Sequence, residues 1–252
     1  MIIMIFDRFG NKENEETISD EDFISRKEFK KLKRLINAHQ YHIDNVHMFY
    51  NLEPTPLLRD MLNLSYELLS FFDNVCRKHG IIYWIDDDTL LNAVRNGQLM
   101  AFSEEISVAV MKSDLDKLND AIQLEIGQAG MSDMEYDLNA LEMSLMCSEI
   151  GDRLLCVSIN AYDDIDGNVV KSSRNQKTEQ NNVFPLNEIQ LGDYSFSIPS
   201  HPNDYLKQMN GKNYIRKISK LHDSSKLNRL KTNEYILKRH IRILEKANEN
   251  FE

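Results

Sequence analysis

The stretch that decides the fold is residues 68–116, which read LLSFFDNVCRKHGIIYWIDDDTLLNAVRNGQLMAFSEEISVAVMKSDLD. An amphipathic helix runs into this stretch and ends at Gly80, because glycine readily takes the conformation that terminates a helix. Beyond Gly80 the pattern predicts three short elements: a strand at 81–85, one or two helical turns at 89–95 and a buried strand at 106–111. A helix therefore leads into short strands that alternate with helices.

The flanking sequence extends this alternation in both directions. The expected elements are an N-terminal heptad-patterned helix at 29–50, a helix at 115–127, strands at 142–150 and 154–162, a polar loop at 163–182 and a C-terminal helix at 227–244. Strands interleaved with helices indicate an α/β (α+β mixed) fold. We expect three parts: an N-terminal polar segment and amphipathic helix at 1–53, a central domain at 54–218 and a basic C-terminal helix at 219–252.

The composition excludes several classes of protein. The chain has 252 residues, of which 42% are hydrophobic and 28% charged, so it is globular rather than disordered. Its longest uninterrupted apolar run is Met1–Phe6, far below the roughly 20 residues of a transmembrane helix. The three cysteines form no C-x-x-C pair, and no secretory signal pattern precedes the domain. We therefore expect a cytoplasmic protein.

Charge is distributed unevenly along the chain. The net charge is −10, yet Lys207–Lys246 holds twelve basic residues against three acidic ones. A mostly acidic body argues against a general nucleic-acid-binding protein. The basic segment fits either a peripheral contact with a membrane or anionic polymer, or a solvated helix face. The helix at 29–50 fits either packing within the chain or a homodimer contact.

Short motifs in the central domain resemble the LicD family, a branch of the nucleotidyltransferase-fold superfamily that includes the fukutin-type proteins. The matching motifs are Lys78-His79-Gly80, Tyr83-Trp84-Ile85-Asp86, Thr89-Leu90-Leu91, Ala93-Val94-Arg95, Ile106–Val108, Val157–Asp163, Val183-Phe184-Pro185-Leu186, Pro199, Tyr205-Leu206 and Tyr214. The resemblance covers residues 54–218. It implies a small mixed sheet flanked by helices, with added helices at both ends.

The resemblance also implies a chemistry. LicD-type enzymes are expected to transfer a phosphocholine-type group from a nucleotide donor such as CDP-choline to a cell-surface glycan. Such a phosphotransferase or nucleotidyltransferase uses Mg²⁺, held by two acidic residues in a D-h-D pair and a third on a neighbouring strand. Residues i and i+2 of a strand share a face, so two carboxylates there can hold a metal ion that neutralises the transferred phosphoryl group.

This sequence departs from the family pattern at each acidic position. Glu105 and Ser107 stand at the D-h-D pair, and Ser158 stands at the third position. The first acidic position of the block is Ser103, followed by Glu104. The resemblance therefore assigns the catalytic positions to Glu105, Ser107 and Ser158, with Glu105 and Glu104 as the candidate metal ligands. A serine hydroxyl is neutral and binds metal weakly beside a carboxylate.

The nucleotide-binding positions differ as well. The resemblance assigns them to Asp88, Thr89 and Arg95, with Asp88 in place of the family's glycine. Thr89 can alternatively be a helix N-cap, and Arg95 either meets a phosphate or pairs with a nearby aspartate. The run Asp86–Asp88 forms either a new cation site or, as the sequence favours, a solvated turn. Asp88 would repel a phosphate.

Two functions are open at this point. The chain is either a phosphotransferase of surface-glycan modification with an altered Mg²⁺ ligand set, or a catalytically inactive pseudoenzyme that acts as a binding or partner protein. The lost carboxylates favour the pseudoenzyme mechanism, whereas the resemblance favours the transferase. The repeated replacement of Asp by Ser is also compatible with deliberate mutation of the site.

Overall fold

The computed structural model describes residues 30, 56–100, 103–174, 176–212, 214 and 234–251. The chain divides into two compact units, residues 1–42 and residues 43–252. All described residues except Lys30 lie in the second unit. The predicted boundaries at 53/54 and 218/219, and the predicted helix at 29–50 apart from Lys30, lie outside the described residues.

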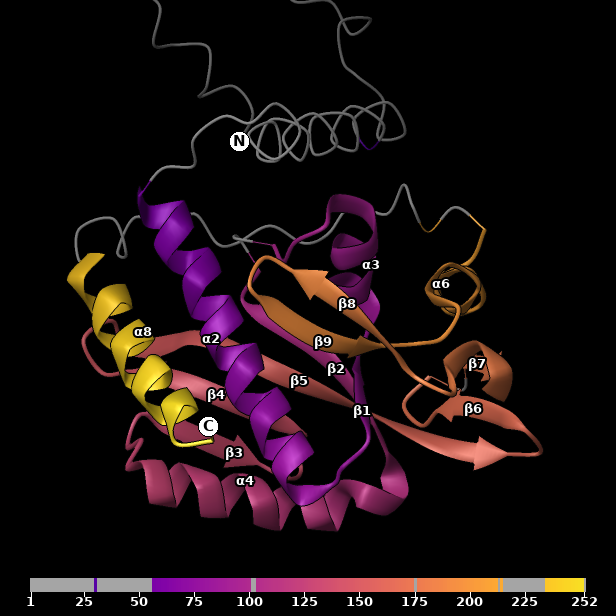
Figure 1. The fold of residues 1–252 in the computed structure, drawn as a ribbon, viewed down its shortest axis with the longest axis horizontal. Coiled ribbons are helices and arrows are strands. Elements are labelled where there is room, and N and C mark those ends of the chain that lie inside the picture. Colours follow the sequence, from indigo (N-terminus) through magenta and orange to yellow (C-terminus); the bar gives the residue numbers. More distant parts are fainter. Residues whose placement is uncertain are drawn as a thin grey trace, which may run out of the picture. The chain divides into compact units, whose positions relative to one another are not determined.

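The described residues form a mixed α and β fold, as the sequence predicts (Figure 1). In chain order the elements are α2 (Pro56–His79), β1 (Tyr83–Ile85), α3 (Asp87–Asn96), β2 (Glu105–Met111), η3 (Lys112–Asp114), α4 (Leu115–Ala129), β3 (Met134–Asp137), β4 (Glu142–Cys147), β5 (Asp152–Ile165), β6 (Asn168–Lys171), β7 (Gln176–Glu179), α5 (Gln180–Val183), β8 (Asn187–Leu191), β9 (Tyr194–Ile198), α6 (Pro202–Asn210) and α8 (Glu234–Glu249).

The main sheet is mixed, with strand order β1-β2-β5-β4-β3 and with β6 and β7 continuing from β5. Its one parallel pair among the described strands is β2 with β5, and the other neighbours run antiparallel. The parallel pair needs a crossover, which runs through α4, β3 and β4. The mixed sheet flanked by helices is confirmed.

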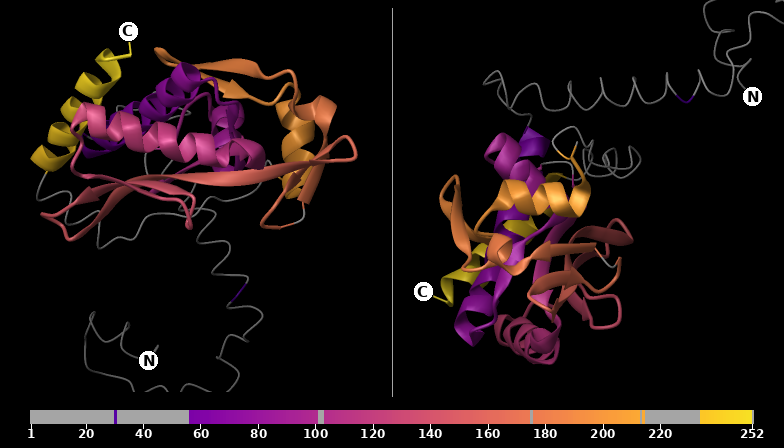
Figure 2. Two further views of the ribbon diagram at one scale, coloured as in Figure 1. Left: turned by 90° about the horizontal axis from the view of Figure 1, so that it is seen from below. Right: turned by 90° about the vertical axis from the view of Figure 1, so that its right-hand side faces the viewer.

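The two faces of the sheet have different surroundings, and strand β1 shows this. Tyr83 packs its ring edge-on against Phe72 of α2, with centroids 5.4 Å apart, whereas the next residue, Trp84, donates to the Tyr205 hydroxyl of α6. Successive strand residues point to opposite faces. We call the first the helix face: α2, α4 and α8 lie on the same side of the sheet (Figure 2). We call the second the site face; it carries those residues of β2 and β5 that point to the same side of the sheet as Trp84.

The C-terminal helix α8 packs on α2. Asn248 donates to the Glu67 backbone carbonyl at 3.1 Å and accepts from Asn74 at 3.2 Å. The Phe251 ring meets Phe71 edge-on. Helices α2 and α8 therefore form one layer. Within the described part of the chain, no helix is long and apolar enough to cross a membrane.

The prediction of a polar loop at 163–182 is wrong. This segment forms β6, β7 and the short helix α5. Asp166 and Gly167, with φ of +52° and +73°, make the turn between β5 and β6. Asp-Gly favours this kind of two-residue hairpin turn. The surrounding residues are polar and charged, however, so the sequence pattern indicated a loop. The hairpin lengthens the sheet and brings Lys171 beside the start of α3.

Candidate functional site

The structure brings together the three positions that the family resemblance makes catalytic. Ser107 of β2 and Ser158 of β5 are direct partners in the parallel register. Glu105 precedes Ser107 by two residues on the same strand, so its side chain belongs to the same site face. Adjacent strands lie about 4.8 Å apart, so the two serines are close neighbours. The relative placement expected from the family pattern is therefore present.

The donor set at these positions does not fit a divalent cation. Ser107 and Ser158 offer neutral hydroxyl groups, and the carboxylate of Glu105 is on an exposed residue. Mg²⁺ in proteins is held by carboxylates and phosphate oxygens rather than by serine hydroxyls alone. No group of three or more His, Cys, Asp or Glu side chains that could hold a metal ion occurs among the described residues. The Mg²⁺ expected from the resemblance therefore lacks its ligands here.

A glutamate lies beside Ser158 but is already engaged. Glu142 of β4 is the antiparallel partner of Ser158. It forms an ion pair with Arg153 and accepts a 2.6 Å hydrogen bond from Ser144. Burial acts to raise the pKa of Glu142, but the hydrogen bonds from Ser144 and Arg153 outweigh it and the pKa is lowered. Glu142 is thus an ionised partner of Arg153.

Thr89 links helix α3 to strand β2. Its Oγ1 accepts a 2.8 Å hydrogen bond from the backbone N–H of Ser107. The prediction that Thr89 caps the helix is wrong, because α3 begins at Asp87 and its N-cap is Asp86. The helix starts two residues earlier than the sequence indicated, and its first residue, Asp87, has a positive φ of 43°, a region that aspartate visits more readily than most residues. Thr89 fixes α3 to β2.

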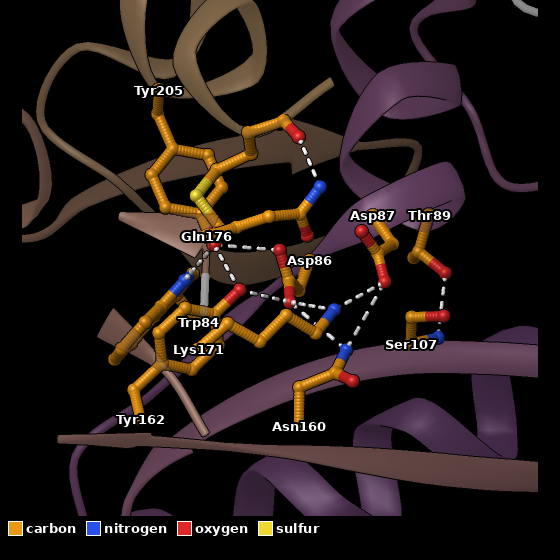
Figure 3. Close-up of polar contacts among 11 residues, drawn as sticks. Trp84, Asp86, Asp87, Thr89, Ser107, Asn160, Tyr162, Lys171, Gln176 and Tyr205 are labelled. Carbon is orange, nitrogen blue, oxygen red and sulfur yellow. Dashed lines mark hydrogen bonds and ion pairs between the residues drawn. The ribbon is translucent and has the colours of Figure 1, made fainter. Parts of the chain in front are cut away.

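Asp86 is buried, which contradicts the predicted solvated turn at Asp86–Asp88. It is 1% exposed. Its carboxylate accepts hydrogen bonds from the hydroxyls of Tyr205 at 2.7 Å and Tyr162 at 2.8 Å, and from Asn160 at 2.9 Å (Figure 3). These donors come from α6 and β5, which are distant in sequence. Asp86 is therefore the centre of a polar cluster under α6.

Lys171 supplies the positive charge of this cluster, and sequence reasoning missed it. The residue is 1% exposed, and its Nζ lies 2.6 Å from Asp87 Oδ2 and 3.5 Å from Asp86 Oδ2. Figure 3 shows the lysine reaching along the Tyr162 ring to the two carboxylates. The Asp-Gly turn that places Lys171 was the available signal. We call Asp86, Asp87, Lys171, Tyr162 and Tyr205 the buried ion cluster.

The single ammonium of the cluster only partly compensates the negative charge of its two carboxylates. Burial and the neighbouring Asp87 carboxylate raise the pKa of Asp86, and the ammonium of Lys171 offsets them only in part. Burial, together with the nearby Asp86, also raises the pKa of Tyr162 and of Tyr205, so both remain protonated donors. One ammonium therefore serves two carboxylates, and the tyrosine hydroxyls complete the shell of Asp86.

Arg95 forms a side-chain hydrogen bond within its own helix, α3. Its Nη2 donates a 2.8 Å hydrogen bond to Asn92 Oδ1, and Asn92 in turn donates to the backbone carbonyl of Asp88 at 2.7 Å. Burial lowers the pKa of Arg95, but the guanidinium stays charged at neutral pH. The contacts of Arg95 and Asp88 with a nucleotide remain predictions.

Comparison with known proteins identifies the domain that contains these residues. A family model described as "LicD/FKTN/FKRP, nucleotidyltransferase domain" matches residues 80–201, just under half of the chain. The matched region runs from the end of α2 to the N-cap of α6 and includes Asp86, Ser107, Ser158 and Lys171. No curated protein matches the sequence.

Proposed function

The chain belongs to the LicD family, and from that premise we propose that it is a catalytically inactive member, a pseudoenzyme that keeps the nucleotidyltransferase scaffold for binding. The family domain indicates a transferase of the family type. The reaction expected of an active member is transfer of a phosphocholine-type group from a nucleotide donor to a glycan. In this member the metal-binding positions no longer carry the charge that this reaction requires.

One observation carries the proposal: Ser107 and Ser158 are register partners on neighbouring strands. If the site had only been displaced, carboxylates would be expected to converge from other positions. Glu142, the cross-strand partner of Ser158, is instead paired with Arg153, and Asp86 and Asp87 are paired with Lys171. Two neutral hydroxyls therefore occupy the positions at which a family enzyme needs two carboxylates.

Several expectations of the family remain predictions for this chain. They are CDP-choline or a similar nucleotide donor, a glycan acceptor, Mg²⁺ and a cytoplasmic location. Contact of the basic segment Lys207–Lys246 with a membrane or anionic polymer, and a homodimer through residues 29–50, are also predictions. A pseudoenzyme acts through what it binds, so these two segments are the first places to look for a partner protein.

Calorimetry on the full chain tests the proposal. The purified protein is titrated with CDP-choline and other nucleotide donors in the presence of Mg²⁺ or Mn²⁺, and release of the free nucleotide is followed in parallel. We expect no heat of binding and no turnover at millimolar ligand. Metal-dependent binding of a nucleotide together with turnover would overturn the proposal, and Glu105 and Glu104 would then be the first metal ligands to test by substitution.

A further inference from the structure

The run Asp86–Asp88 creates an electrostatic problem at the start of α3. Asp86 is fully buried, and the Asp87 side chain is 22% exposed. Adjacent carboxylates repel each other, and a carboxylate is costly to bury without an opposite charge. The positive φ of Asp87 adds local backbone strain at the same turn. Something positive has to hold this turn together.

The Lys171 ammonium meets this need from a strand far away in sequence. It lies 2.6 Å from Asp87 Oδ2 and 3.5 Å from Asp86 Oδ2, and over the Tyr162 ring at 5.9 Å from its centroid. The side chain is 2% exposed, so the ammonium is nearly withdrawn from water. A buried ammonium is itself costly unless paired, so the lysine and the aspartates stabilise each other.

We propose that Lys171 is a tethered cation that holds the Asp86–Asp87 turn at the start of α3, where an unattached cation would otherwise be required. The turn carries Thr89, which anchors α3 to the backbone of Ser107. Lys171 is thus a positioning residue for the site face. The inference does not rest on the proposed function, because an active enzyme could use the lysine in the same way.

Chemical rescue tests the inference. In Lys171→Ala the lost group has the size and charge of a propylammonium ion. We expect the substitution to lower the Tm by about 10 °C. Propylammonium chloride should restore at least half of that loss, whereas NaCl at equal ionic strength and neutral 1-propanol should not. Equal effects of propylammonium and NaCl on the Tm would overturn the inference.

The matched control is Lys112→Ala. Lys112 also faces a carboxylate, with 3.8 Å between its Nζ and Asp163, but its side chain is 60% exposed. This surface pair contributes little to stability. We expect a small change in Tm and no rescue by propylammonium. Equal rescue of both variants would mean that the amine acts on the protein in general, which would also overturn the inference.

A second set of variants covers the case in which Lys171→Ala does not fold. Lys171→Met keeps most of the apolar stem and removes the charge. Combining it with Asp86→Asn and Asp87→Asn removes the repulsion as well. If a cation is what the turn needs, the triple variant will be more stable than Lys171→Met alone. A triple variant no more stable than Lys171→Met would overturn the inference, whatever the wild type does with nucleotides.

Discussion

The buried ion cluster and the Ser107–Ser158 pair lie on the same sheet face, but the cluster contains charged side chains and the serine pair is neutral. In the cluster, Asp86 and Asp87 share the Lys171 ammonium and are largely closed to water. At the serine pair, two neutral hydroxyls stand side by side in register. The carboxylates of the cluster thus have their counter-ion within the chain, whereas the two serines carry no charge. We expect the cluster to stabilise the fold, whereas the family resemblance assigns the serine positions to catalysis.

The largest effect is expected from Asp86→Ala. It removes the shared acceptor of Tyr162, Tyr205 and Asn160, and it leaves the Lys171 ammonium with Asp87 as its remaining partner in the cluster. Removing one partner of a buried ion pair typically costs about 3–5 kcal/mol. Denaturant unfolding of the variant and the wild type measures this loss. A loss below about 1 kcal/mol would show that the cluster does not hold the fold.

Tyr205→Phe should have a smaller effect in the same cluster. The hydroxyl lies 2.7 Å from Asp86 Oδ1 and 2.8 Å from the Tyr162 hydroxyl, and it accepts from Trp84 Nε1 at 3.3 Å. The ring stays in place, so only the hydrogen bonds are lost, at about 1–3 kcal/mol. Unfolding curves give the value. An unchanged midpoint would mean that Asp86 is satisfied without α6.

The serine pair should tolerate substitution. Ser107→Ala and Ser158→Ala remove hydroxyls from a position where no charge depends on them, so each should change the unfolding free energy by less than about 1 kcal/mol. The same denaturation experiment compares them directly with Asp86→Ala. If either alanine variant were as destabilised as Asp86→Ala, the contrast between the two regions would collapse.

The pH dependence of stability sharpens the contrast further. The pKa of Asp86 is raised in the folded protein, by burial first and by Asp87 second, above about 3.9 for an unfolded aspartate. The stability contributed by its protonated form is complete below the unfolded pKa and is lost as pH rises through the folded pKa. The free energy of unfolding of the wild type should therefore fall relative to that of Asp86→Asn as the pH rises above about 3.9, the pKa of an unfolded aspartate.

An opposite trend would contradict this electrostatic reading. A rise relative to Asp86→Asn over the same pH range would mean that Lys171 dominates and lowers the pKa of Asp86. Glu142 provides the internal comparison, because its pKa is lowered by Ser144 and Arg153 in spite of burial. Its contribution is present above the unfolded pKa and is lost as pH falls. Glu142→Gln should therefore show the reverse trend in acid.

The helix face could be predicted from the sequence because it is built on local patterns. The apolar spacing of α2, the stop at Gly80 and the short apolar strands each lie within a few residues, and all are confirmed. Within the predicted strand at 81–85, Tyr83 and Trp84 are buried, at 2% and 0% exposure. Such patterns need no knowledge of distant contacts.

The buried ion cluster could not be predicted in this way. Three adjacent aspartates indicate a solvated turn unless a counter-ion is known, and Lys171 lies 84 residues from Asp87 in sequence. It also lay in a segment wrongly interpreted as a loop. The serine pair could be predicted only from the family resemblance, which aligned Ser107 and Ser158 with acidic positions. The Asp166-Gly167 turn was the local signal that would have placed Lys171.

The loss of metal binding at the serine pair is tested most directly by a Mn²⁺ titration followed by electron paramagnetic resonance, comparing the wild type with Ser107→Asp/Ser158→Asp. The free ion gives a signal that is lost on binding. We expect the wild type to leave millimolar Mn²⁺ free, whereas the double variant binds the ion because Glu105 and the two new carboxylates share the site face. Ser195→Asp, on the β8–β9 hairpin, is the control for added charge. Binding of Mn²⁺ by the wild type as tightly as by the double variant would mean that the serine pair has not cost the site its metal ion.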